Sequence, residues 1–185
     1  LAHYMDRGGN FIDTANAYTR GHSEVIIGDA LARTPGRRDR VVLATKFLSN
    51  LYPGDPNGGG AGRKSLQAAC EQSLRRLKTD YIDLYWMHCW DALTPIEETM
   101  RALDDLVRAG KVRYIGSSTA PGWHVATSVM TSERLGSCCV SRSPTRAWRA
   151  RCRYDPWMGT KHFGRTSDSS SFSSSRDTNW RAPVG

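Results

Sequence analysis

Four polar side chains stand at or just beyond the ends of short apolar runs, in positions where a catalytic site can form. They are Asp13, Tyr18, Lys46 and His88. A lysine that ends an apolar run is costly to bury without a partner, and Asp13, at the end of the preceding run, is the expected partner. The paired ammonium group would lie beside Tyr18, where it favours the phenolate and makes the phenol a better proton donor. With His88 to orient a polar substrate, these residue types indicate proton donation to a carbonyl oxygen while hydride reaches the carbonyl carbon.

Each of these residues also has a structural interpretation when it is considered alone. Asp13 could cap the following turn, and Tyr18 could be an ordinary half-buried aromatic residue. Lys46 could extend to solvent along its aliphatic stem, and His88 could be a hydrogen-bonded core histidine. Four such coincidences at successive strand ends are harder to accept than one shared function, so the catalytic interpretation is preferred.

The elements that must position these residues alternate between strands and helices. Short runs rich in β-branched or aromatic residues predict buried parallel strands from Asn10 to Thr14, Val41 to Phe47, Ile82 to His88 and Val112 to Ser117. Parallel α/β folds place their active sites at the carboxyl ends of such strands. The four polar residues therefore stand where an active site is expected.

Amphipathic segments between the strands predict helices. They cover about residues 63–77, the stretch from Ser23 to the Pro35-Gly36 turn, and the stretch from Thr94 to Gly110. In the last of these, Thr94 as N-cap and Glu97 three residues later predict a capping box, and Gly110 stands where a C-terminal cap belongs. The alternation predicts an α/β architecture with a parallel sheet. Periodicity alone leaves open whether that sheet is doubly wound or closed into a barrel.

The composition changes after residue 135. Of the residues behind the net charge of +8, 17 Lys/Arg and 15 Asp/Glu lie in residues 1–135, whereas 9 and 3 lie in residues 136–185 together with ten serines. This stretch is predicted to be a disordered Ser/Arg-rich tail outside the fold. A basic tail could bind nucleic acid, but a shift of the reading frame near residue 135 is favoured, because a disordered tail seldom scatters Trp and Cys among its charges.

Other features restrict the class of protein. No apolar run approaches the roughly 20 residues that a membrane span needs, so no membrane partner is expected. The chain begins at Leu1 without a signal segment, which is typical of a fragment whose true start is missing. Five irregularly spaced cysteines suit reduced thiols in a cytoplasmic protein. Without a CxxC pair and with widely separated histidines, no metal site is predicted.

Several stretches resemble the aldo-keto reductase family, in particular its bacterial aryl-alcohol-dehydrogenase-like members and the potassium-channel β subunits. They include GGNFIDTANAY, SEVIIGDAL, RDRVVLATKF, the run from RKSLQAAC to LYWMHCWD, and TPIEETMRALDDLVRAGKVRYIGSS. The resemblance covers about residues 1–135. It implies an eight-stranded (β/α) TIM barrel, of which this chain holds about strands two to five with their helices, and it implies NADPH as the cofactor.

The resemblance also implies roles for individual residues. Asp13, Tyr18, Lys46 and His88 match the family's catalytic four. Ser118 falls on a family serine that contacts the nicotinamide amide, and Thr119 stands where an asparagine is common. Trp90 either lines the substrate pocket or is an aromatic residue of the barrel rim.

The function implied by the resemblance is NADPH-dependent reduction of an aldehyde or ketone to an alcohol, acting on a small-molecule carbonyl or alcohol substrate. Because the family's first strand and its last three are not recognised here, this chain is expected to be impaired. The alternative is a non-catalytic regulatory or binding protein of the potassium-channel β-subunit type. Nucleic acid is a disfavoured partner, and the sequence carries no prediction of oligomeric state.

Overall fold

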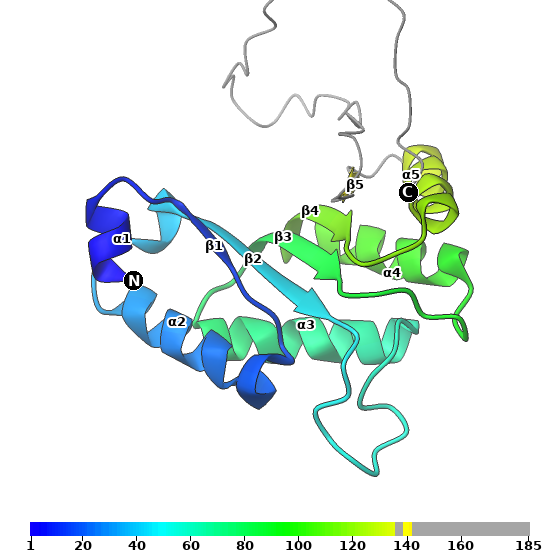
Figure 1. Cartoon of the computed structure of the whole chain (residues 1–185), viewed down its shortest axis with the longest axis horizontal. Helices are drawn as coiled ribbons and strands as arrows, with labels where there is room; N and C mark the ends of the chain where they lie inside the picture. The colour runs from blue at the N-terminus through cyan, green and yellow to red at the C-terminus, as the bar shows by residue number, and fades with distance from the viewer. Residues whose placement is uncertain (136–138, 142–185) are drawn as a thin grey trace, which may run out of the picture. The chain divides into compact units, whose positions relative to one another are not determined.

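The fold is built on one parallel sheet. The computed structural model describes residues 1–135 and 139–141. Its five strands pair in chain order, every neighbouring pair parallel: β1 (Phe11–Asp13), β2 (Val42–Phe47), β3 (Ile82–Met87), β4 (Val112–Ser117) and β5 (Cys139–Ser141) (Figure 1). The first four confirm the predicted strands to within one residue at each end.

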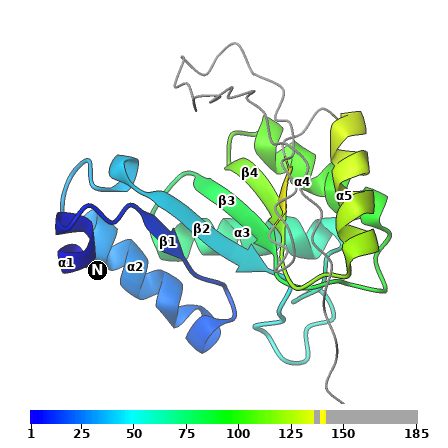
Figure 2. The same ribbon diagram turned by 45° about the horizontal axis from the view of Figure 1, so that its top comes forward.

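Helices connect the strands in turn. They are α1 (Ala2–Asp6), α2 (His22–Ala32), α3 (Arg63–Leu77), α4 (Ile96–Arg108) and α5 (Gly122–Leu135), with the short 3-10 turns η1 (Tyr18–Gly21) and η2 (Arg38–Arg40). Figures 1 and 2 show α2, α3 and α4 side by side along one face of the sheet. Strands that pair in chain order, with α2, α3 and α4 following β1, β2 and β3 on one face, form an α/β partial barrel, and the predicted fold class is confirmed.

The start of α4 differs from the prediction. Pro95 is its N-cap and no side chain caps it, so the predicted capping box is wrong. The Thr94 hydroxyl instead donates to Asp91 Oδ2 at 2.8 Å, a hydrogen bond strengthened by the charge of the carboxylate. The C-terminal cap is confirmed: Gly110 has a φ of +73° and its N–H donates to Val107 O at 2.9 Å.

The two faces of the sheet have different environments. The main hydrophobic core lies between the sheet and the helices and includes Leu43, Phe47, Tyr85, Met87 and Ile115 from the strands. A smaller buried cluster of Ala44, Leu84 and Trp86 lies on the opposite face. Lys46 is aligned with Trp86, and Asp13 with Ala44, so the strand alternation places both charged residues on the face opposite the helices.

A buried polar network joins β2 to the helices on the other face. Glu24 of α2 is fully buried. Its carboxylate accepts hydrogen bonds from Thr45 Oγ1 at 2.6 Å and from Arg76 Nε of α3 at 2.7 Å. Because Thr45 directly precedes Lys46, this network fixes β2 from behind the site.

The structure adds a strand beyond the predicted end of the fold. β5 pairs with β4 in parallel, with Ile115 opposite Cys139. Three residues are too few to show a periodic pattern, so sequence analysis placed no strand after residue 135. The rest of the predicted tail, residues 136–138 and 142–185, lies outside the described residues. Among the residues that are described, no helix has the length and apolar character to cross a membrane.

Gly28 allows α2 and α3 to approach closely, which generates a test of the packing. A Cβ atom at this position would lie 2.8 Å from the Leu77 Cα. We expect Gly28→Ala to lower the free energy of unfolding by about 1–3 kcal/mol, since the helices must separate. Urea denaturation of the chain measures this change.

The matched control is Gly122→Ala at the first residue of α5, where a Cβ atom would meet nothing within 4 Å. That variant should keep the wild-type midpoint or raise it, as alanine does in an uncrowded helix. A Gly28→Ala variant as stable as the Gly122→Ala control would contradict this helix packing.

Candidate active site

A buried ammonium group forms the centre of the site. Lys46 lies on β2 with only 6% of its side chain exposed, and its Nζ is 2.7 Å from Asp13 Oδ2 at the end of β1. Nζ also donates to the Thr14 carbonyl oxygen at 2.8 Å. The ion pair expected from the sequence is therefore present, and its carboxylate remains partly exposed. Together the two acceptors hold the ammonium group in one position.

Tyr18 lies next to this ammonium group. Its hydroxyl oxygen is 3.5 Å from Lys46 Nζ, and Nζ is 5.1 Å from the centre of its ring. The side chain is 43% exposed, so a ligand can reach the hydroxyl. The chain turns sharply just after Tyr18, because Thr19 and Arg20 have φ values of 48° and 55° and Gly21 continues with 88°. This left-handed turn leads directly into α2.

His88 completes the group from the third strand. It follows β3 directly, and its backbone N–H donates to Phe47 O at 3.2 Å. Its ring stands edge-on to the ring of Tyr18, with centroids 6.0 Å apart and planes at 81°. Burial lowers the pKa of His88 from its ordinary value, the Lys46 ammonium lowers it further, and Asp13 partly opposes both. The imidazole is therefore neutral near pH 7 and can donate one ring N–H.

The end of β4 contributes two hydroxyl groups. The Ser118 backbone N–H donates to Met87 O at 2.9 Å, which keeps this segment beside the end of β3. Ser118 Oγ and Thr119 Oγ1 are 3.3 Å apart, and Thr119 has a φ of 50°. Both are accessible, Ser118 half-buried and Thr119 exposed. These two side chains offer donors and acceptors to a polar ligand at the same edge of the sheet as His88.

Trp90 lies two residues beyond His88, and its contacts are with α5. Its ring packs against Trp123 with centroids 5.0 Å apart and against His124 at 5.8 Å. Trp90 was predicted from the sequence as a pocket or rim residue, whereas Trp123 and His124 were assigned no role. Their positions in the sequence could have identified them as candidates, because both lie shortly after the end of β4, as Trp90 lies shortly after the end of β3.

Asp91 is a third residue that sequence reasoning missed. Its carboxylate accepts hydrogen bonds from Ala61 N and Thr94 Oγ1, each at 2.8 Å, and from Leu93 N at 2.9 Å. Burial acts to raise the pKa of Asp91, but these hydrogen bonds outweigh it and the pKa lies below its ordinary value. The residue thus ties the long loop after β2 to the loop that carries His88 and Trp90.

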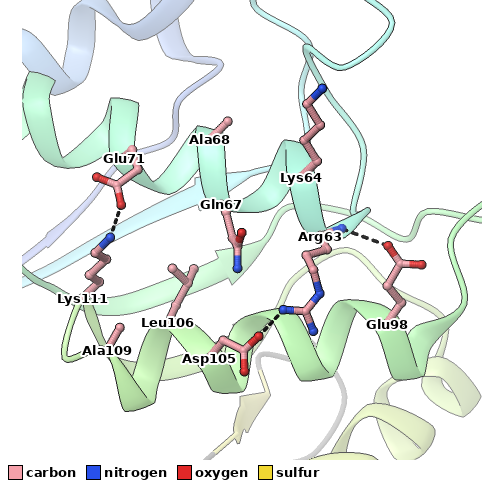
Figure 3. A pocket seen from close by; sticks show the side chains of 10 residues that line it. All are labelled: Arg63, Lys64, Gln67, Ala68, Glu71, Glu98, Asp105, Leu106, Ala109 and Lys111. Atoms are coloured by element: carbon pink, nitrogen blue, oxygen red, sulfur yellow. Dashed lines mark hydrogen bonds and ion pairs between the residues drawn. The ribbon is translucent and has the colours of Figure 1, made fainter.

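A groove lies elsewhere, between α3 and α4 (Figure 3). It has a volume of about 830 Å³, and ion pairs join Arg63 to Asp105 and Lys111 to Glu71 across it. Its charged side chains largely satisfy one another, and none of the four strand-end residues lines it. The strand ends remain the better candidate for chemistry, because a proton donor, a fixed cation and a neutral imidazole meet there.

Comparison of the sequence with known proteins finds a family match and several relatives. A sequence model of the aldo/keto reductase family matches residues 1–143. An aryl-alcohol dehydrogenase of Pestalotiopsis microspora is 44% identical over 137 residues, covering 72% of this chain and 35% of that protein. Norsolorinic acid reductase B of Aspergillus parasiticus is 46% identical over 131 residues, covering 68% of this chain and 34% of that protein. The chain thus spans about a third of the length of these relatives.

The charges around His88 generate a test of the site. Replacing the ammonium group in Lys46→Met should raise the titration midpoint of His88, because a cation that disfavours imidazolium is removed. Asp13→Asn should lower the midpoint, because the carboxylate favours imidazolium. The measurement is an NMR pH titration of the His88 ring protons.

Lys64→Met serves as the control for these two variants. This lysine lies on α3 and is not among the groups that shift the pKa of His88, so the midpoint should stay at the wild-type value. Shifts of the same sign in Lys46→Met and Asp13→Asn would be incompatible with the described arrangement of charges.

Proposed function

This chain belongs to the aldo/keto reductase family, and on that premise we propose that its site reduces an aldehyde or ketone to an alcohol with NADPH, using Tyr18 as the general acid. The observation that carries the proposal is the position of Lys46 Nζ, 2.7 Å from Asp13 and 3.5 Å from the Tyr18 hydroxyl. The printed names of the relatives, aryl-alcohol dehydrogenase and norsolorinic acid reductase, support oxidoreductase chemistry between carbonyl and alcohol groups.

Tyr18, Lys46 and Asp13 would each have a separate role in the proton transfer. A reduced nicotinamide, when bound, supplies hydride to the carbonyl carbon. The Tyr18 hydroxyl donates its proton to the carbonyl oxygen, and the Lys46 ammonium stabilises the phenolate that remains. Asp13 holds the ammonium group in place through their ion pair. In the reverse direction the phenolate accepts the proton of an alcohol.

His88 would orient the substrate. A neutral imidazole donates a hydrogen bond from one ring nitrogen, and burial and the Lys46 ammonium both favour this neutral form. The ring lies beside that of Tyr18, with centroids 6.0 Å apart, and in the proposed reaction both residues would donate to the same carbonyl oxygen. Two donors that converge on the oxygen stabilise the negative charge that develops there.

The end of β4 fits a nicotinamide amide. Ser118 and Thr119 are linked to each other only by a long hydroxyl contact of 3.3 Å, so their hydroxyls can exchange it for hydrogen bonds to a carboxamide. The pairing of Met87 with Ser117 places these residues beside the end of β3 and its His88. The choice of NADPH rather than NADH rests on the family resemblance.

The proposal also covers the domain bounds, the substrate and the cellular location of the protein. Residues 1–135 would form the catalytic part and residues 136–185 would lie outside it. The partner would be a small-molecule carbonyl or alcohol, with Trp90 lining its pocket. A cytoplasmic location is supported by the free thiols of Cys70 and Cys89.

The test uses a completed barrel. Residues 1–135 replace the matching segment of the 46% identical norsolorinic acid reductase B, so that this chain's site residues are carried by a full-length relative. We expect oxidation of NADPH with an aromatic aldehyde, faster than with NADH, and a loss of about 10²- to 10⁴-fold in kcat for Tyr18→Phe. The 185-residue chain assayed in parallel should turn over more slowly.

Tyr52→Phe is the matched control, because Tyr52 is a similarly exposed tyrosine whose hydroxyl contacts Gln72 rather than Lys46. Its kcat should equal that of the parent. Full activity in Tyr18→Phe would rule out the proposed acid. Tight NADPH binding without turnover would instead favour the non-catalytic channel-subunit type of function.

A further inference from the structure

The first turn of α2 contacts both strands that carry the ion pair of the site. Ser23 Oγ lies 2.9 Å from Thr14 Oγ1, just after β1. The next residue, Glu24, accepts a hydrogen bond from Thr45 Oγ1 of β2 at 2.6 Å. Thr14 and Thr45 are the direct chain neighbours of the two charged residues of the ion pair. Two consecutive residues of one helical turn therefore bond to the neighbours of both charges.

The Glu24 side chain is itself held from a second helix. It is fully buried, and its other carboxylate oxygen accepts a hydrogen bond from Arg76 Nε of α3 at 2.7 Å. Arg76 also packs against Gly21, the N-cap of α2, because a Cβ atom there would lie 2.9 Å from Arg76 Nε. A buried carboxylate with both oxygens bonded has little freedom to move, so it offers Thr45 a fixed partner.

These contacts reach the reacting groups through two short paths. The Thr14 carbonyl oxygen accepts a hydrogen bond from Lys46 Nζ at 2.8 Å, so the hydroxyl contact of Thr14 with α2 steadies one of the acceptors of the ammonium group. Thr45 shares a peptide bond with Lys46, so its hydrogen bond to Glu24 steadies the strand that carries the ammonium group. The 3.5 Å between Nζ and the Tyr18 hydroxyl depends on both paths.

We propose that Ser23 and Glu24 are positioning residues of the reaction, which hold Lys46 Nζ at its distance from the Tyr18 hydroxyl without touching substrate or cofactor. The proposal rests on the proposed function for the role of Tyr18 as the acid. It gives a role in the reaction to a buried charge on the opposite face of the sheet from the site. Since the ammonium group stabilises the phenolate formed in the reaction, looser positioning should slow proton transfer and leave substrate binding unchanged.

The first test is an NMR pH titration of the His88 ring protons in the 185-residue chain without cofactor. Thr45→Val keeps the shape of the side chain and removes the hydroxyl that bonds to Glu24. We expect the His88 midpoint to rise, in the same direction as in Lys46→Met but by less, because a loosened ammonium group gains contact with water and acts less strongly on the imidazole. Ser23→Ala should shift the midpoint in the same direction, and Thr45→Ser, which keeps the hydroxyl, should have the wild-type midpoint.

The second test measures turnover in the completed barrel. We expect Thr45→Val to lower kcat about 10-fold with KM unchanged, less than the roughly 10²-fold that a displacement of 1 Å can cost. Thr45→Ser should recover most of this loss. Because the titration involves no reaction, the two proposals fail separately: a shifted midpoint in a parent that reduces no carbonyl would refute the proposed function and still support the positioning of the ammonium group.

Thr99→Val is the matched control for both tests. Thr99 of α4 is as buried as Thr45, and its hydroxyl donates to the Ala61 carbonyl oxygen at 3.1 Å. The control thus loses one buried hydrogen bond, as Thr45→Val does, and should lower stability by a similar amount while leaving the His88 midpoint and kcat at their parent values. An unchanged or lowered midpoint in Thr45→Val, or effects equal to those of Thr99→Val, would overturn the proposal.

Discussion

The structure depends on a positive charge that is held almost entirely out of water. Lys46 lies on the second strand, and its ammonium group is stable there only because Asp13 and the Thr14 carbonyl accept from it. Loss of one partner from a buried ion pair typically costs about 3–5 kcal/mol. The pairing of β1 with β2 and the placement of the proposed acid thus depend on the same group, because Tyr18 approaches that ammonium as well.

The sheet determines which way this charge faces. Successive side chains of β2 point to opposite faces of the sheet, so Lys46 lies on the face opposite the helices and Thr45 on the face toward them. There the buried Glu24 carboxylate accepts a hydrogen bond from the Thr45 hydroxyl. A slip of one residue in β2 would place the ammonium in the hydrophobic core and Thr45 at the site. The Glu24 network on one face and the Asp13 pair on the other therefore select the same register.

Sequence patterns predicted the helices and strands well, but they predicted only some of the polar contacts. The helix over residues 63–77 was predicted to the residue, because its apolar side chains recur with helical spacing over four turns. The predicted capping box at Thr94 is wrong because the helix begins one residue later, with Pro95 as its N-cap, and the Thr94 hydroxyl bonds to Asp91. β5 and the cluster of Trp90, Trp123 and His124 had no periodic signal, since each arises from a few residues brought together by the sheet.

The sequence by itself determined the order of strands and helices, and with it the residue types that stand at each strand end. These are local properties, set by side-chain periodicity and by the chemistry of single residues. The tertiary structure decided which of those residues meet. Lys46 lies 33 positions from Asp13 and 28 from Tyr18, and only the parallel pairing of the strands brings its ammonium within 2.7 Å of one and 3.5 Å of the other. Such distances depend on how separate elements pack together, which no local pattern encodes.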